Sequence, residues 1–246
     1  MNRRIKLLTF SLCALLSGVG ACASSPTGSN SAGGNSAAAS PASGSTGGGG
    51  IGAPAITAND KPLDVMTKAM RAQLDAKSYR AHVTSTLADG VSTKMLIEYV
   101  APDSFRMTRV GQGSSAGGDS TMEYVVVKGA MYMKMPDGGW MKSPVDASEM
   151  IKTFRDPKML DELVKTAEVK FIGPDTLDGA PMLVYQYTQN NPMGMNLKST
   201  AKTWLSVADG LPRKTETEGE FNGQKTKTLI TISDYNADIK IESPLK

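Results

Sequence analysis

The chain has 246 residues, with 27 basic and 24 acidic side chains and a formal net charge of +3. The excess comes from Arg3, Arg4 and Lys6, so the chain beyond them is neutral, with 24 basic and 24 acidic side chains. A neutral chain disfavours a nucleic-acid partner, which requires clustered basic charge, and disfavours attachment to an anionic membrane surface by charge alone.

The N-terminus has the pattern of an export signal. The basic residues precede an apolar run from Leu7 to Leu16, which is too short to span a membrane, and small residues then lead to a cysteine. The sequence Val19-Gly20-Ala21-Cys22 resembles the lipobox of bacterial lipoproteins. This resemblance implies a signal peptide over residues 1–21, a diacylglycerol on the Cys22 thiol and a further acyl chain, such as palmitate, on the amine that cleavage exposes. A cysteine near an ordinary cleavage site is the alternative.

The 34 residues from Ala23 to Ile56 are predicted to be a disordered tether. They include no charged residue and are almost all Ser, Gly, Ala, Pro, Thr or Asn, so they cannot bury enough apolar surface to fold. Flexible-chain statistics give them a reach of about 30–35 Å, enough to hold a domain clear of a membrane. Residues 22–56 are therefore assigned to anchor and linker, and residues 57–246 to one folded domain.

The folded domain is predicted to begin with a helix and to continue as an antiparallel meander. The helix spans Pro62 to Ala76, with Asp60 as its cap and an apolar face of Leu63, Met66, Met70 and Leu74. Two shorter helices are expected over Asp146–Phe154 and Pro157–Thr166. Alternating patterns predict ten strands, near Tyr79–Ala88, Val91–Val100, Ser104–Val110, Thr121–Lys128, Ala130–Met135, Glu168–Gly173, Met182–Gln189, Thr200–Val207, Arg213–Phe221 and Gln224–Asp234.

Two turn sequences allow the register of hairpins to be predicted. Asn222-Gly223 suits a two-residue turn and places Glu220 opposite Lys225 and Glu218 opposite Lys227 on a solvated face. The same reasoning applied to Asp89-Gly90 places His82, Thr84 and Thr86 on one face with Ile97, Met95 and Thr93, and places Ala81 and Val83 on the other with Leu96 and Glu98.

The chain is rich in methionine, with 15 residues. Met131, Met133 and Met135 alternate along one predicted strand and therefore share a face. Because methionine is flexible and polarizable, such a face suits a core, or a wall against a variable apolar ligand. Copper(I) binding by these thioethers, or by Met193 and Met195, is a third possibility.

Enzyme chemistry is not expected. His82 is the only histidine, and no Ser, Asp or Glu falls in a G-x-S-x-G or H-E-x-x-H motif. Cys13 leaves with the signal and Cys22 carries lipid, so the folded domain is expected to have no disulfide, no thiol nucleophile and no cysteine metal site. The glycine-rich run from Gly111 to Gly118 lacks the ending of a phosphate-binding loop and is predicted to connect two strands.

Three short motifs resemble the LolA/LolB-like superfamily, most nearly lipoproteins of the LppX and LprG type. They are Pro102-Asp103-Ser104-Phe105-Arg106-Met107, Leu177-Asp178-Gly179-Ala180-Pro181 and the stretch from Lys202 to Lys214, and the resemblance extends over Asp60 to Pro244. It implies an α+β fold in which a curved, incomplete antiparallel β-barrel of about ten or eleven strands is covered by helices. It further implies an apolar cavity for acyl chains, and no catalytic residues or cofactor beyond the lipid on Cys22.

Strand alternation supplies the candidates for the lining of that cavity, which are Met95, Ile97, Tyr99, Phe105, Met107, Met131, Met133 and Met135. The expected function is that of an envelope lipoprotein that binds or shuttles a lipid or acylated ligand. A structural module that binds an envelope protein is the alternative, and copper handling is the third hypothesis. Because Ala23 follows the anchor, the expected location is the periplasmic face of an outer membrane or the outer leaflet of a plasma membrane.

Overall fold

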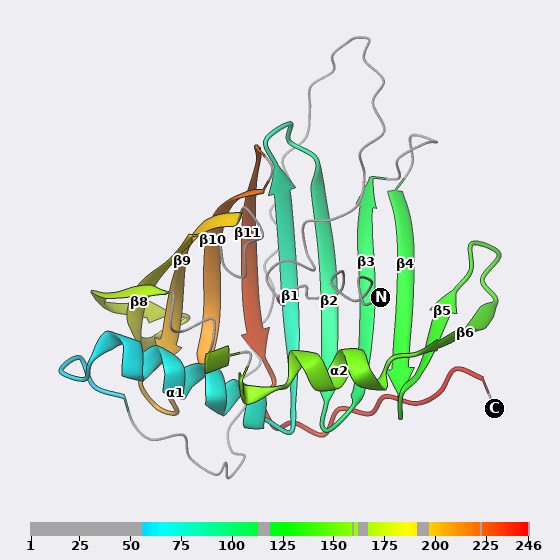
Figure 1. Cartoon of the computed structure of the whole chain (residues 1–246), viewed down its shortest axis with the longest axis horizontal. Coiled ribbons are helices and arrows are strands. Elements are labelled where there is room, and N and C mark those ends of the chain that lie inside the picture. Colours follow the sequence, from blue (N-terminus) through cyan, green and yellow to red (C-terminus); the bar gives the residue numbers. More distant parts are fainter. Residues whose placement is uncertain are drawn as a thin grey trace, which may run out of the picture.

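One curved antiparallel sheet, with helices on one of its faces, makes up the structure (Figure 1). The computed structural model describes residues 56–112, 119–158, 160–161, 167–190, 197–221 and 223–245. The predicted class, an unclosed antiparallel barrel with covering helices, is confirmed, and the described sheet has eleven strands. In chain order the elements are α1 (Pro62–Asp75), β1 (Ser78–Leu87), β2 (Ser92–Val100), β3 (Ser104–Gln112), β4 (Asp119–Val127), β5 (Ala130–Lys134), β6 (Trp140–Asp146), α2 (Ser148–Phe154), β7 (Glu168–Leu177), β8 (Ala180–Asn190), β9 (Leu197–Ser206), β10 (Pro212–Phe221) and β11 (Gln224–Ser233).

The sheet consists of two meanders joined through their first and last strands. Its order is β6-β5-β4-β3-β2-β1-β11-β10-β9-β8-β7, so β1 pairs with β11 and every other pair is consecutive in the chain. The connection from β6 to β7 runs between the two edges of the sheet and contains α2. Figure 1 shows α1 and α2 on the same face, across the end of the sheet where β1 begins.

The hairpin of β10 and β11 has the predicted register. Glu220 lies opposite Lys225 and Glu218 opposite Lys227, and Glu218 and Lys227 form an exposed ion pair of 2.8 Å. Gly223 has a φ of +84°, a left-handed conformation that glycine adopts without steric cost.

The predicted register of β1 and β2 is wrong by one residue. The turn is a three-residue loop, in which the Leu87 N–H donates to the Val91 carbonyl at 2.9 Å and Gly90 adopts a φ of +87°. Ala81 and Val83 therefore pair with Ile97 and Met95, and His82 lies exposed on the opposite face. A one-residue slip moves every side chain of a strand to the other face, which is why the loop length decides the outcome.

The strand β6 was not predicted from the sequence, and one predicted helix lies mostly outside the described residues. β6 contains Lys142 and Pro144, and such a sequence is tolerated because β6 is an edge strand. Of the helix predicted over Pro157–Thr166, residues 159 and 162–166 are not among those described. Neither α1 nor α2 is long and apolar enough to cross a membrane.

The start of α1 differs from its prediction in two details. Asp60 does not cap the helix, because its carboxylate accepts hydrogen bonds from the backbone N–H and hydroxyl of Thr57, each at 3.0 Å. Leu63 is 39% exposed, and the buried side chains of the helix are Val65, Met66 and Ala69. The first turn is instead favoured by Pro62 and Asp64, which suit the early positions of a helix.

Each helix closes one part of the core. α1 packs on β8 and β9, where Tyr185 and Leu205 are fully buried. Ile151 of α2 packs on Val126 of β4, together with Phe105 and Met131. The side that α1 and α2 cover is called the helix-side face below, and the other side is called the outer face.

Candidate functional site

The register of the strands places the predicted cavity residues on the helix-side face. Tyr99, Phe105, Val126 and Met131 pair in one row across β2 to β5, and Phe105, Val126 and Met131 pack against α2. Since alternate residues of a strand share a face, the candidates that lie on the helix-side face are Met95, Ile97, Tyr99, Phe105, Met107, Met131 and Met133. Met135 follows the end of β5 and is 39% exposed.

Three of these candidates belong to the packed core at the α2 end. Phe105 and Met131 contact the buried cluster of Val126, Ala147 and Ile151. Tyr99 is buried, and its hydroxyl donates to the Pro102 carbonyl at 3.2 Å. Their position in the core is sufficient to explain why these side chains are apolar, and no ligand is needed to account for them.

The next row along the strands is less enclosed and forms the candidate site. Ile97 pairs with Met107, Met107 with Tyr124, Tyr124 with Met133 and Met133 with Met141. Met122 lies beside Tyr124, and the Met122 sulfur is 4.0 Å from the Tyr124 hydroxyl oxygen. The Met122 and Met141 side chains are each 41% exposed. The name methionine patch is used below for Ile97, Met107, Met122, Tyr124, Met133 and Met141.

Sequence reasoning did not include three members of the methionine patch. Met122 and Tyr124 alternate on β4 in the same way as the candidates on β5, so the same period-two argument could have found them. Met141 lies on β6, which was not predicted as a strand. The patch is apolar and partly exposed, which suits contact with flexible hydrocarbon.

A row of hydroxyl groups adjoins the methionine patch. Thr93, Ser85, Thr228 and Thr217 pair in succession across β2, β1, β11 and β10 on the helix-side face. The Ser85 and Thr228 hydroxyls are 3.3 Å apart. These four residues are called the hydroxyl row below, and they give the face a polar band beside an apolar one.

The two covering segments are tied to each other and to the sheet. The Arg155 guanidinium donates a hydrogen bond to the Leu74 carbonyl in α1 and lies 4.7 Å from the centroid of the Tyr99 ring. Arg71 of α1 pairs with Asp161 at 2.7 Å. Beneath them burial raises the pKa of Tyr79 to about 12, and burial also raises the pKa of Tyr99. This end of the face is therefore closed.

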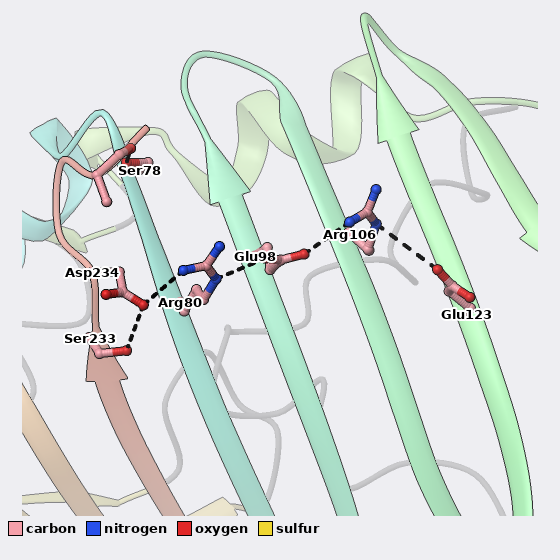
Figure 2. Close-up of polar contacts among 8 residues, drawn as sticks. Ser78, Arg80, Glu98, Arg106, Glu123, Ser233 and Asp234 are labelled. Carbon is pink, nitrogen blue, oxygen red and sulfur yellow. Dashed lines mark hydrogen bonds and ion pairs between the residues drawn. The ribbon is translucent and has the colours of Figure 1, made fainter. Parts of the chain in front are cut away.

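The outer face carries a ladder of alternating charges (Figure 2). Arg80 bonds Glu98 at 2.8 Å and Asp234 at 3.0 Å, and Arg106 bonds Glu98 at 3.2 Å. Glu123 continues the ladder to Arg106 at 4.0 Å and to Lys134 at 3.2 Å. Because each charge has a neighbour of opposite sign, the ladder joins five strands and offers no excess charge to a ligand.

A second cluster on the outer face holds Trp204. Its indole N–H donates to Asp175 at 2.7 Å, and the Lys214 ammonium lies 4.4 Å from the ring centroid. The hydrogen bond from Trp204 lowers the pKa of Asp175, and the bond from the Thr176 N–H adds to that effect. Met182 and Val184 pack against the ring, so the cluster is structural.

The copper(I) hypothesis concerns methionine thioethers, and only some of those methionines lie among the described residues. They contain no group of three or more His, Cys, Asp or Glu side chains that could hold a metal ion. The copper(I) hypothesis rests on thioethers, of which Met131 and Met133 share a face of β5. Met193 and Met195 lie outside the described residues, as do Cys13, Cys22 and the linker.

Comparison with known proteins identifies the fold. No family profile and no curated protein matches the sequence. Among solved structures, LprF from Mycobacterium bovis matches with a TM-score of 0.51 and 14% identity, covering 74% of this chain and 96% of LprF. The Mycobacterium tuberculosis lipoprotein LppX matches with a TM-score of 0.50 and 14% identity, covering 73% of this chain and 97% of LppX. The chain therefore has the LolA-like fold, related to that of LppX, that its sequence motifs indicated.

Proposed function

We propose that this chain is a lipid-anchored envelope lipoprotein whose helix-side face binds the acyl chains of a lipid. The observation that carries the proposal is the methionine patch, an apolar surface that continues beyond α2 on the covered face of the sheet. The fold shared with the lipoprotein LppX supports it. Transfer of hydrocarbon from water to such a surface is favourable by about 25 cal/mol for each Å² of apolar area removed from water.

The mechanism we propose is uptake without reaction. Acyl chains lie along the methionine patch, where flexible side chains adapt to their shape. Phe105 and Met131 pack against α2, and together with the buried Tyr99 they form the closed end of the binding region. Release requires the segment around α2 to move, and the bonds of Arg155 and Arg71 to their partners are the contacts that such a movement would break.

Lipid content tests the proposal. The chain from Ala23 to Lys246 retains every described element and lacks the anchor. We expect this chain, purified without detergent from a bacterial host, to show a bound acyl lipid at near one-to-one stoichiometry by native mass spectrometry. Lipid-free protein that also fails to take up added phospholipid would contradict the proposal.

The anchor is part of the same proposal and has its own test. Cys22 is proposed to carry the lipid and residues 23–56 to act as the tether, with the domain on the periplasmic face of an outer membrane or the outer leaflet of a plasma membrane. We expect metabolic labelling with a fatty acid to mark the full chain, and Cys22→Ala to abolish the label and release the protein from the membrane fraction. A label that persists in Cys22→Ala would contradict this assignment.

A partner-binding role is the second candidate, and the sheet edges favour it. Val145 on edge strand β6 is 61% exposed and Ile172 on edge strand β7 is 52% exposed. Exposed apolar side chains on unpaired edges are suited to strand addition by a protein partner. Capture of an envelope protein that is lost in Val145→Lys or Ile172→Lys, by a chain that binds no lipid, would favour this role.

A further inference from the structure

A single arginine lies on the helix-side face beside the methionine patch. Arg109 pairs with Met95 on β2 and with Met122 on β4, in the row beyond Met107. β3 pairs with both neighbours without a register shift, so Arg109 shares its face with Phe105 and Met107. The Arg109 guanidinium therefore belongs to the same face as the proposed acyl site.

Arg109 has no acidic partner in the part of the chain that the structure describes. Its side chain is partly buried and makes no ion pair or hydrogen bond with a described residue. The acidic side chains described on β1 to β5, Glu98 and Glu123, both lie in the charge ladder of the outer face. By contrast, Arg106 lies on the outer face and pairs with both of these carboxylates.

The surroundings of Arg109 change from apolar to polar along the strands. On one side lie Met107 and the rest of the methionine patch, and on the other lies Thr93 of the hydroxyl row. Thr93 pairs with Gly111, and a Cβ on Gly111 would come within 3.1 Å of the Thr93 hydroxyl oxygen. Because Gly111 has no side chain, the Thr93 side chain can lie next to Arg109 without a steric clash.

We infer that Arg109 binds the acidic head group of the lipid, with the acyl chains on the methionine patch and the hydroxyl row beside the head group. This inference rests on the proposed function and names the class of lipid, an amphiphile that carries a phosphate or carboxylate. A guanidinium recognises either group through paired N–H donors, and a charged hydrogen bond of this kind is stronger than a neutral one. Burial beside methionine strengthens it further, because water competes less.

A competition between two lipids tests the inference. Vesicles of phosphatidylcholine hold equal amounts of phosphatidic acid and diacylglycerol with the same acyl chains, and the protein is the chain from Ala23 to Lys246. After separation from the vesicles by flotation, bound lipids are quantified by mass spectrometry. We expect the wild type to prefer phosphatidic acid by about tenfold, the ratio that one charged hydrogen bond gives. We expect Arg109→Gln to lower this ratio to near one, with unchanged total lipid per protein.

Two further variants separate recognition from other effects. Lys94→Gln removes the same charge from the neighbouring strand on the outer face and is expected to keep the wild-type ratio. Arg109→Lys is expected to restore most of the preference, because it keeps the charge and loses only the paired geometry. Urea unfolding of each variant checks that the sheet is intact.

The outcomes distinguish the two levels of the proposal. If the wild type takes up both lipids equally, or if Arg109→Gln retains the preference, Arg109 does not bind the head group and the acyl site stands. If the wild type takes up neither lipid, the proposed function fails and the inference fails with it.

Discussion

At the scale of single residues, Trp204 and Asp175 form a contact that pH should break. The indole hydrogen bond holds the pKa of Asp175 below 3.8, the ordinary value for aspartate. The contribution of this bond to folding is therefore fully present above pH 3.8 and is lost as the pH falls through the lowered pKa. We expect Trp204 fluorescence in the folded protein to change only below pH 3.8.

Asp175→Asn supplies the comparison for this transition. Asn cannot ionise, so this acid transition is expected to disappear, while the contribution of Trp140 stays the same in both proteins. An identical transition in the variant would assign it to another group.

Met133 is the residue at which the acyl site can be challenged most simply. Met133→Asp places a charge in the middle of the methionine patch, between Tyr124 and Met141. Because hydrocarbon cannot solvate a carboxylate, we expect lipid bound per protein to fall by about tenfold or more. The measurement is lipid extraction after incubation with vesicles.

Val110→Asp is the matched control for Met133→Asp. Val110 is 39% exposed and lies on the outer face of β3, so this variant is expected to bind lipid as the wild type does. If Met133→Asp unfolds while Val110→Asp does not, Met133 is a core residue rather than part of a binding surface.

At the scale of elements, the charge ladder links β1 to β5 through Glu98. The Glu98 side chain is only 12% exposed and accepts hydrogen bonds from both Arg80 and Arg106. We expect Glu98→Gln to lower the free energy of unfolding by about 1–3 kcal/mol, because two guanidinium groups lose a charged acceptor. Urea denaturation measures the change.

Glu218→Gln is the control for the ladder. Glu218 pairs with Lys227 in the β10–β11 hairpin, where both side chains are more than 70% exposed. Exposed pairs are weak, so a loss of about 0.5 kcal/mol or less is expected. Equal losses in the two variants would show that the ladder adds nothing beyond ordinary surface pairs.

The loop between β1 and β2 depends on glycine at one position. Gly90 has a φ of +87°, and nothing lies within 4 Å of a Cβ placed there, so only backbone strain opposes a larger residue. We expect Gly90→Ala to lower the free energy of unfolding by about 1 kcal/mol, measured by urea denaturation. Gly219→Ala, in a strand and with no contact closer than 3.5 Å, should be neutral or stabilising. A stabilised Gly90→Ala would contradict the left-handed loop.

These elements also show what could be predicted from the sequence. Asn222-Gly223 determined its register because a two-residue turn leaves one choice, and the pairing of Glu220 with Lys225 is confirmed. Asp89-Gly90 did not determine the register of its hairpin, because the same sequence is compatible with a loop of two residues or of three. Only the backbone hydrogen bonds of the folded chain distinguish the two loops. β6 was missed because an edge strand tolerates a proline that period-two patterns exclude.

At the scale of the whole molecule, the fold class could be predicted and the depth of each side chain could not. Alternating strands and short turns indicate an antiparallel meander, and the LolA-like fold is confirmed. The pairing of β1 with β11 joins residues far apart in the chain, which no local pattern specifies. For the same reason alternation placed Met131 and Met133 on one face but could not tell that Met131 lies in the packed core beneath α2.

The two helical covers lie over only part of one face of the sheet. α1 and the α2 segment close one end of the helix-side face, and the methionine patch extends the apolar surface beyond them. The outer face differs in carrying the charge ladder and the Trp204 cluster. A lipid carrier requires such a distinction between its two faces, since only one of them can receive acyl chains.

The most direct test is photo-crosslinking with a phospholipid that carries a diazirine on its acyl chain. The chain from Ala23 to Lys246 is loaded from vesicles, irradiated and digested, and the labelled residues are located by mass spectrometry. We predict labels on the helix-side face, at Ile97, Met107 and Met133. Labels confined to outer-face residues such as Val110 and Leu229, or no label at all, would contradict an acyl-chain site on the helix-side face.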